Sequence, residues 1–291
     1  MLDSGTGATT SPMQRERDLW WSINSPALIT QQSQLLQSAE KPEQARRLPV
    51  FTNGPIPPKD HRVGRYFESL VEFWLSKQEP ITLIAKNHPI QREGRTWGEL
   101  DFVFRMDSGP IFHWETAVKF YLYDQHHRQH ESHFIGPNTN DTFERKMGRV
   151  FSHQLELTCP TLPQVDHHEP HIKGRIFYHP KQAPPIVLPK HLSPHHLRGL
   201  WLRINELKDF LSSRQDWRFQ VIQKPYWLAE LALDPKAPPL HNASQLVEVL
   251  TTHFSASERS ILCAAYRHHT PHGIESERFF VVREDWPRET I

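Results

Sequence analysis

Residues 97–123 contain two apolar runs in which charged side chains fall on alternate positions, joined by an Asp-Ser-Gly-Pro turn at 107–110. Side chains alternate between the two faces of a β-strand, so each run presents one apolar and one charged face. Turn residues between two such runs favour an antiparallel hairpin. The charged faces are Glu99 and Asp101 on the first strand, and Glu115, Ala117 and Lys119 on the second; Leu100, Phe102 and Phe104, and Trp114, Thr116, Val118 and Phe120, form the opposite faces.

This arrangement is costly without a partner. Like charges on neighbouring strands repel each other, and carboxylates beside an apolar core lose their water. A divalent cation would remove both costs, so the hairpin predicts a metal site.

The composition excludes several classes of protein. The 291 residues are 37% hydrophobic and 11% aromatic, which is enough for a folded core. A net charge of +1 gives no general attraction to nucleic acid or membrane, so an anionic partner would need a local basic patch. Two distant cysteines fit a reducing compartment, and no signal peptide or membrane span is recognisable. We therefore expect a cytoplasmic protein without a membrane partner.

Histidines are frequent, and their clusters raise the question of a zinc site. The clusters lie in polar stretches without a nearby cysteine, which favours a partly exposed polar surface over zinc. They are His126, His127, His130 and His133; His167, His168 and His171; and His268, His269 and His272.

The chain divides into three parts at proline-rich stretches. Residues 1–60 read as a flexible tail to about 16, short helical pieces and a connector; 61–182 form a compact core; and 183–291 form a C-terminal α+β portion that can pack on the core. In the core we expect a helix at 63–77, a strand at 81–91, the hairpin, a helix at 142–157 and a strand at 171–179. Further on we expect helices at 194–211 and 243–254, and strands at 218–223, 260–267 and 277–283.

The helix expected at 142–157 has a basic face formed by Arg145, Lys146 and Arg149. Such a face can position the phosphates of a nucleic acid, although most basic helix faces simply meet water. Glu68, on the helix at 63–77, lies beside aromatic residues and shares a face with Glu72, four positions on.

The order helix-strand-strand-strand-helix-strand, with Gly-Glu-Leu-Asp at 98–101 and Glu115 followed by Lys119, resembles the core of the PD-(D/E)XK nuclease superfamily. Over most of its length the chain looks most like an uncharacterised bacterial family, a domain of unknown function placed in that superfamily. The resemblance implies a mixed α/β fold with a restriction-endonuclease-like core, extra N-terminal helices and a C-terminal α+β portion.

The resemblance also implies roles for individual residues. Asp101 and Glu115 would bind Mg²⁺ or Mn²⁺ together with the backbone carbonyl of Thr116, since hard oxygen ligands suit these ions. Glu68 corresponds to the acidic residue of the first helix, and Lys119 to the motif lysine. The implied activity is metal-dependent hydrolysis of phosphodiester bonds in DNA, or less favourably in RNA.

One position departs from the superfamily pattern. The lysine normally stands two residues after the second acid, where this chain has Ala117, and Lys119 lies about 7 Å further along the strand. Gln154 is a further candidate substrate contact. Two alternatives to a nuclease stay open: a catalytically inactive nucleic-acid-binding protein of the same fold, and a protein interaction module. The sequence does not indicate an oligomeric state.

Overall fold

The computed structural model describes residues 12–31, 62–233, 239–267 and 273–288. Its helices and strands are α1 (Pro12–Asn24), α3 (Val63–Ser76), β1 (Ile81–Arg92), β2 (Arg95–Met106), β3 (Ile111–Tyr123), β4 (Phe134–Ile135), α4 (Phe143–Ser152), η2 (Gln154–Glu156), β5 (His167–Tyr178), β6 (Leu197–Arg203), η3 (Ile204–Glu206), α5 (Leu207–Ser212), β7 (Arg218–Val221), α6 (Ala243–Ala256), β8 (Ile261–Tyr266) and β9 (Glu277–Val282).

One mixed sheet of nine strands runs through the described residues in the order β1-β2-β3-β5-β6-β9-β8-β7, and β4 pairs with β3 outside this path. The strands β3, β5, β6 and β9 are mutually parallel, whereas the pairs β1-β2, β2-β3, β9-β8 and β8-β7 are antiparallel. The expected mixed α/β class is therefore confirmed. The C-terminal portion extends the sheet of the core, because β6 pairs with β5.

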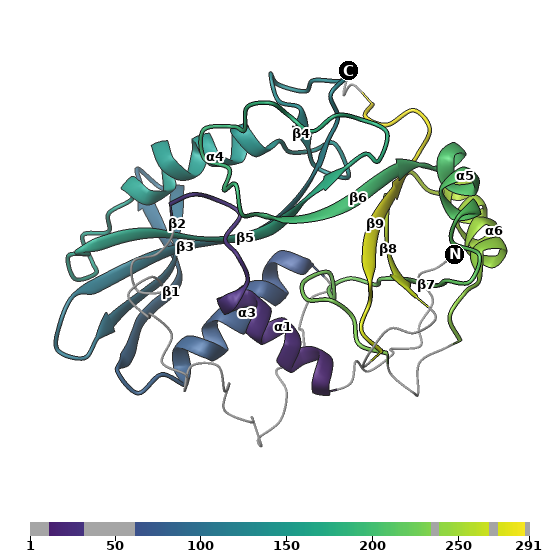
Figure 1. The fold of residues 1–291 in the computed structure, drawn as a ribbon. Helices are drawn as coiled ribbons and strands as arrows, with labels where there is room; N and C mark the ends of the chain where they lie inside the picture. The colour runs from purple at the N-terminus through teal and green to yellow at the C-terminus, as the bar shows by residue number, and fades with distance from the viewer. Residues whose placement is uncertain (1–11, 32–61, 234–238, 268–272, 289–291) are drawn as a thin grey trace.

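Helices cover both faces of this sheet (Figure 1). On one face α1 and α3 pack in a large apolar cluster with side chains from β2, β3, β6, β8 and β9. On the other face α4 packs over β3 and β5, while α5 and α6 pack over β6 to β9. A parallel strand in such a fold is buried on both sides, and this is the position of β3.

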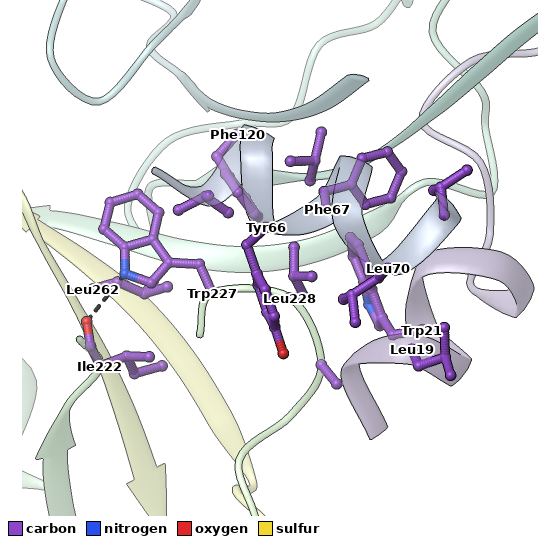
Figure 2. Packing of buried hydrophobic residues seen from close by; sticks show 14 of the residues in the cluster. Leu19, Trp21, Tyr66, Phe67, Leu70, Phe120, Ile222, Trp227, Leu228 and Leu262 are labelled. Atoms are coloured by element: carbon purple, nitrogen blue, oxygen red, sulfur yellow. Dashed lines mark hydrogen bonds between the residues drawn. The ribbon is translucent and has the colours of Figure 1, made fainter. Parts of the chain in front are cut away.

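The helix α3 forms as its sequence pattern predicts. Its buried residues recur every three or four positions, which makes one continuous apolar stripe; they are Val63, Tyr66, Phe67, Leu70, Val71 and Leu75. Figure 2 shows Tyr66, Phe67 and Leu70 in the core, beside Leu19 and Trp21 of α1. The helix thus lies over the face of β3 that carries Trp114.

Several expected boundaries were wrong. The segment expected to be helical at 194–211 contains the strand β6, and only Leu207–Ser212 is α-helical there. The reason is a period of two: Trp201 packs in the α3 cluster and Leu202 in the α5 and α6 cluster. The helix α1 begins within the expected tail, α4 ends at Ser152 before the short helix η2, and β5 begins at His167 within an expected loop. Most of the expected tail and connector lies outside the described residues.

The hairpin formed as expected, with one exception on its apolar face. Phe102 and Phe104 pack in the α3 cluster, but Leu100 packs with Ile90 and Leu157 instead. The reason lies in the neighbouring hairpin, formed by β1 and β2, whose pairing is interrupted twice by register shifts. Such irregularities bend and twist the strands, so the side chains at the two ends of β2 need not point to the same cluster.

A buried arginine fixes a C-terminal segment under the sheet. The Arg278 guanidinium donates hydrogen bonds to the carbonyls of Trp227, Leu228 and Ala229, and it forms an ion pair with Glu275. Figure 2 places Trp227 and Leu228 against the same core as α3. Arg278 therefore holds this segment where it closes the apolar cluster.

Asp18 of α1 also contacts the segment 227–229 that Arg278 holds. Its carboxylate accepts hydrogen bonds from the Ala229 amide at 3.1 Å and from the Tyr66 hydroxyl at 2.9 Å. Burial raises the pKa of Asp18 from 3.8 to about 7, although these hydrogen bonds and Arg278 act in the opposite direction.

In the described residues, no helix is long and apolar enough to cross a membrane.

Replacing Arg278 with leucine is expected to lower the free energy of unfolding by about 3–5 kcal/mol, because Glu275 becomes a buried charge without its partner. Chemical denaturation of purified protein measures this change. The solvent-exposed Arg288, which pairs with Glu258 and Asp285, is the control: Arg288→Leu is expected to leave the denaturation midpoint unchanged. Equal effects of the two substitutions would contradict a structural role for Arg278.

The raised pKa of Asp18 predicts a pH dependence of stability. A carboxyl group with a higher pKa in the folded state favours folding fully below its unfolded pKa, and this contribution is lost as pH rises through about 7. Between about pH 5 and pH 8, wild type is expected to lose stability relative to Asp18→Asn, which keeps the hydrogen-bonding shape without the charge. Parallel denaturation curves at both pH values are the measurement, and an unchanged difference between the two proteins contradicts the prediction.

Candidate functional site

The pairing of β2 with β3 ends where the two predicted acids begin. The paired positions run from Arg105 and Ile111 to Phe102 and Trp114, and in the same register the next positions are Asp101 and Glu115. There a side-chain oxygen takes the place of a backbone carbonyl as the hydrogen-bond acceptor. Oδ2 of Asp101 accepts hydrogen bonds from the Thr116 amide at 2.7 Å and from the Thr116 hydroxyl at 3.1 Å. The opened hairpin thus brings the two acids together.

The Thr116 carbonyl faces the same opening. In a strand, the amide and carbonyl of one residue point to the same neighbouring strand. Because the Thr116 amide is turned to Asp101, its carbonyl is turned to that side as well. The Thr116 carbonyl is therefore directed toward the strand that carries Asp101.

Glu115 is buried in the middle of the sheet, with 1% of its surface exposed. Its Oε1 lies 3.4 Å from the Lys146 Nζ, and its buried Oε2 has no hydrogen-bond partner among the described residues. Burial raises the pKa of Glu115 to about 8, with a further rise from Asp101 and an opposing effect of Lys146. A buried carboxylate oxygen without a partner is unusual in a folded protein, and a cation would satisfy it.

Lys146 lies within the site and not on an outer face. Its amine donates to Oε1 of Gln154 at 2.9 Å as well as approaching Glu115, and its side chain is 15% exposed. The small Ala117 packs against the apolar cluster that contains Met147 of α4. The long stem of Lys146 spans the distance from α4 to Glu115 on β3.

Lys119 has a different partner. Its amine forms an ion pair with Asp141 at 2.7 Å, and the Tyr121 hydroxyl donates to the same carboxylate oxygen at 3.3 Å. The residue lies on the strand of Glu115, but its charge is already paired away from the acids.

Glu68 of α3 interacts electrostatically with Asp101 and Glu99. Burial raises the pKa of Glu68 to about 7, followed in effect by Asp101 and Glu99, while Arg65 and Lys86 oppose the rise. Burial likewise raises the pKa of Asp101, against the hydrogen bonds from Thr116. Burial is the largest cause of both shifts, and the neighbouring carboxylates add to it.

The remaining predicted contacts divide between the site and the surface. Gln154 holds Lys146, so it is a neighbour of the acids. Arg145 and Arg149 are exposed on α4, and Arg149 acts electrostatically on Glu115. Two of the three basic residues therefore remain available to a partner in solvent.

A histidine pair near Glu115, formed by the buried His113 and the partly exposed His168, was missed from the sequence. His113 lies two residues before Glu115 on β3, and its Nδ1 is 3.1 Å from Nδ1 of His168 on β5. Burial lowers the pKa of His113 to about 3, so the pair is neutral. Recognising that β5 begins at His167 would have revealed it, because His113 and His168 are register partners.

The donor set suits a cation that keeps much of its water. Within the described ranges, no three His, Cys, Asp or Glu side chains are grouped so that they could hold a metal by themselves. Mg²⁺ binds through one or two carboxylates and retains several waters, and it prefers oxygen donors. Asp101, Glu115 and the Thr116 carbonyl fit this ion better than they fit zinc.

Comparison with known proteins gives a family without a known activity. A family model described as a domain of unknown function (DUF1853) matches residues 17–282. No curated protein and no solved structure match the chain.

Addition of Mg²⁺ or Mn²⁺ is expected to raise the thermal unfolding temperature of the wild-type chain, because a ligand bound only by the folded state stabilises it by about 2.7 kcal/mol at a hundredfold excess over Kd. Asp101→Asn combined with Glu115→Gln should abolish the shift. Asp209→Asn, at an exposed position on α5, is the control and should retain it. A shift that survives in the double variant would place the cation elsewhere.

Proposed function

Since this chain belongs to the family described as a domain of unknown function (DUF1853), we propose its activity from the site itself: it is a divalent-metal-dependent nuclease that hydrolyses phosphodiester bonds in DNA. One observation carries the proposal. Two mostly buried carboxylates, Asp101 and Glu115, meet where the hairpin opens, and a lysine amine lies beside one of them. A site built only for stability would gain more from apolar residues here.

The arrangement of elements supports the proposal. The helix α3, the three antiparallel strands β1 to β3, the helix α4 and the parallel strand β5 follow the order of the PD-(D/E)XK core that the sequence resembles. In that arrangement the two acids lie on β2 and β3, as they do here. We therefore propose the superfamily relationship together with the activity.

Asp101, Glu115 and the Thr116 carbonyl are the residues that would hold Mg²⁺ or Mn²⁺. When bound, such an ion polarises a phosphoryl oxygen and lowers the pKa of water. The chain's own residues do the rest: Asp101 is oriented by its two hydrogen bonds from Thr116, and Glu115 is kept out of water by the helices on both sides.

We assign the role of the motif lysine to Lys146. Its amine lies 3.4 Å from Glu115, whereas the Lys119 amine is paired with Asp141. A fixed positive charge beside the two carboxylates stabilises the negative charge that develops on phosphate during hydrolysis. Gln154 accepts a hydrogen bond from Lys146 and so orients the amine.

Glu68 and the exposed arginines complete the site. The Glu68 carboxyl group, on α3, interacts electrostatically with Asp101, which suits a second cation or a water bound to the first. Arg145 and Arg149 stand on the exposed side of α4 and can contact the phosphates that flank the reacting one.

The purified full-length chain is expected to cleave plasmid or oligonucleotide DNA in the presence of Mg²⁺ or Mn²⁺ and to be inactive with a chelator. Lys146→Met should lower the cleavage rate by about 10²–10³, as expected when a charge that stabilises the transition state is removed. Lys119→Met should have a smaller effect, and Lys208→Met, on the exposed surface of α5, should have none.

The decisive variant is Asp101→Ala with Glu115→Ala. Cleavage that persists in this protein would show that the activity comes from another site or a contaminant. If wild type binds DNA but cleaves none of the duplex, single-stranded and branched substrates tested, the nuclease assignment is wrong and a binding protein is left. A wild type without any affinity for nucleic acid would leave the interaction module.

A further inference from the structure

The tip of the β1-β2 hairpin brings two arginines together. Glu93 and Gly94 form the two-residue turn, with φ of 50° and 73°, as tight hairpins of this kind require. Arg92 and Arg95 are direct partners across the two strands. Like charges in this position destabilise a hairpin, and an anion between them removes the cost.

A tryptophan stands beside these arginines with half of its surface in solvent. Trp97 is 52% exposed. Ile90 pairs with Gly98, and the next residue, Gln91, pairs with Thr96. Trp97 therefore has no partner on β1 and is the extra residue of a β-bulge. Bulges redirect a side chain and occur often beside functional sites.

The indole is held from two directions. The Arg92 guanidinium lies 5.3 Å from the ring centroid, and the ring of His153 meets it edge-on at 5.6 Å. His153 also contacts the carbonyl of Trp97 at 3.2 Å. The exposed aromatic is thus fixed in orientation, which lowers the entropy cost of stacking a ligand on it.

Trp97 lies near the proposed catalytic site, both through contacts between side chains and along β2. His153 precedes Gln154, which holds Lys146 against Glu115. Along β2, Trp97 lies four residues before Asp101, or about 13 Å. Four stacked nucleotides cover about the same distance along a strand.

We infer that Trp97, with Arg92, Arg95 and His153, binds unpaired nucleotides, and that this hairpin-tip platform directs the enzyme to DNA with single-stranded regions. The inference rests on the proposed nuclease function and specifies its substrate class. The bases of an intact duplex are stacked on each other, so an exposed indole can stack only on an unpaired base, while the arginines contact its phosphates. The exposed carboxylates of Glu93 and Glu99 offset part of the positive charge, so stacking carries most of the affinity.

The test is binding of two fluorescent probes to the full-length chain in the presence of a chelator, which prevents cleavage: a single-stranded oligonucleotide of thymidines and a duplex of equal length. Trp97→Ala should weaken single-strand binding by about tenfold or more, because stacking on an aromatic contributes this much per base. Trp97→Phe should keep most of the affinity, and duplex binding should change less than about twofold. Trp20→Ala removes another exposed tryptophan, 43% exposed on α1, and should have no effect.

Three results would overturn the inference: no binding of the single strand, equal losses for single strand and duplex, or equal effects of Trp97→Ala and Trp20→Ala. Thermal unfolding of each variant separates loss of folding from loss of binding. The two proposals fail separately. Single-strand binding that depends on Trp97 without cleavage rejects the nuclease alone, whereas cleavage of single-stranded DNA by Trp97→Ala at the wild-type rate rejects the platform alone.

Discussion

The burial of β3 on both faces governs the rest of this structure. Helix α3 covers one side of the strand and α4 the other, so a charged residue in its middle can lose nearly all of its contact with water. Glu115 is such a residue, and the neutral pair His113 and His168 is its neighbour. Burial raises the pKa of this carboxyl group, so it stays ionised at neutral pH only with a positive charge close to it, either a lysine or a cation.

The structure meets this need from α4 and by opening the hairpin. Lys146 reaches Glu115 from the helix, and the carboxylate of Asp101 takes the place of backbone pairing at Thr116. Neither contact offsets the burial of these groups completely, because burial still raises the pKa values of Glu68, Asp101 and Glu115. Such a cluster costs stability, and the nuclease function that we propose would explain why the chain keeps it.

The C-terminal portion is part of the same sheet and not an appendage. Strands β6 and β9 continue the parallel order beyond β5, and the segment held by Arg278 fills the core beneath α3 (Figure 2). Asp18 ties α1 to that segment. The sheet that positions Asp101 and Glu115 therefore depends on residues more than a hundred positions away in the chain.

The sequence by itself determined the local structure: the apolar stripe of α3, the hairpin with its turn at 107–110, and the place of Asp101 and Glu115 on its two adjoining strands. These follow from periodicity and turn chemistry, which act over a few residues. Only the tertiary structure decided that 197–203 is a strand, that His113 meets His168, and that Lys146 lies at the acids while Lys119 pairs with Asp141. The physical reason is that these features depend on which elements pack against each other. Packing decides which partner a long side chain reaches and whether a short apolar segment is buried, and it is set by contacts between residues far apart in the chain.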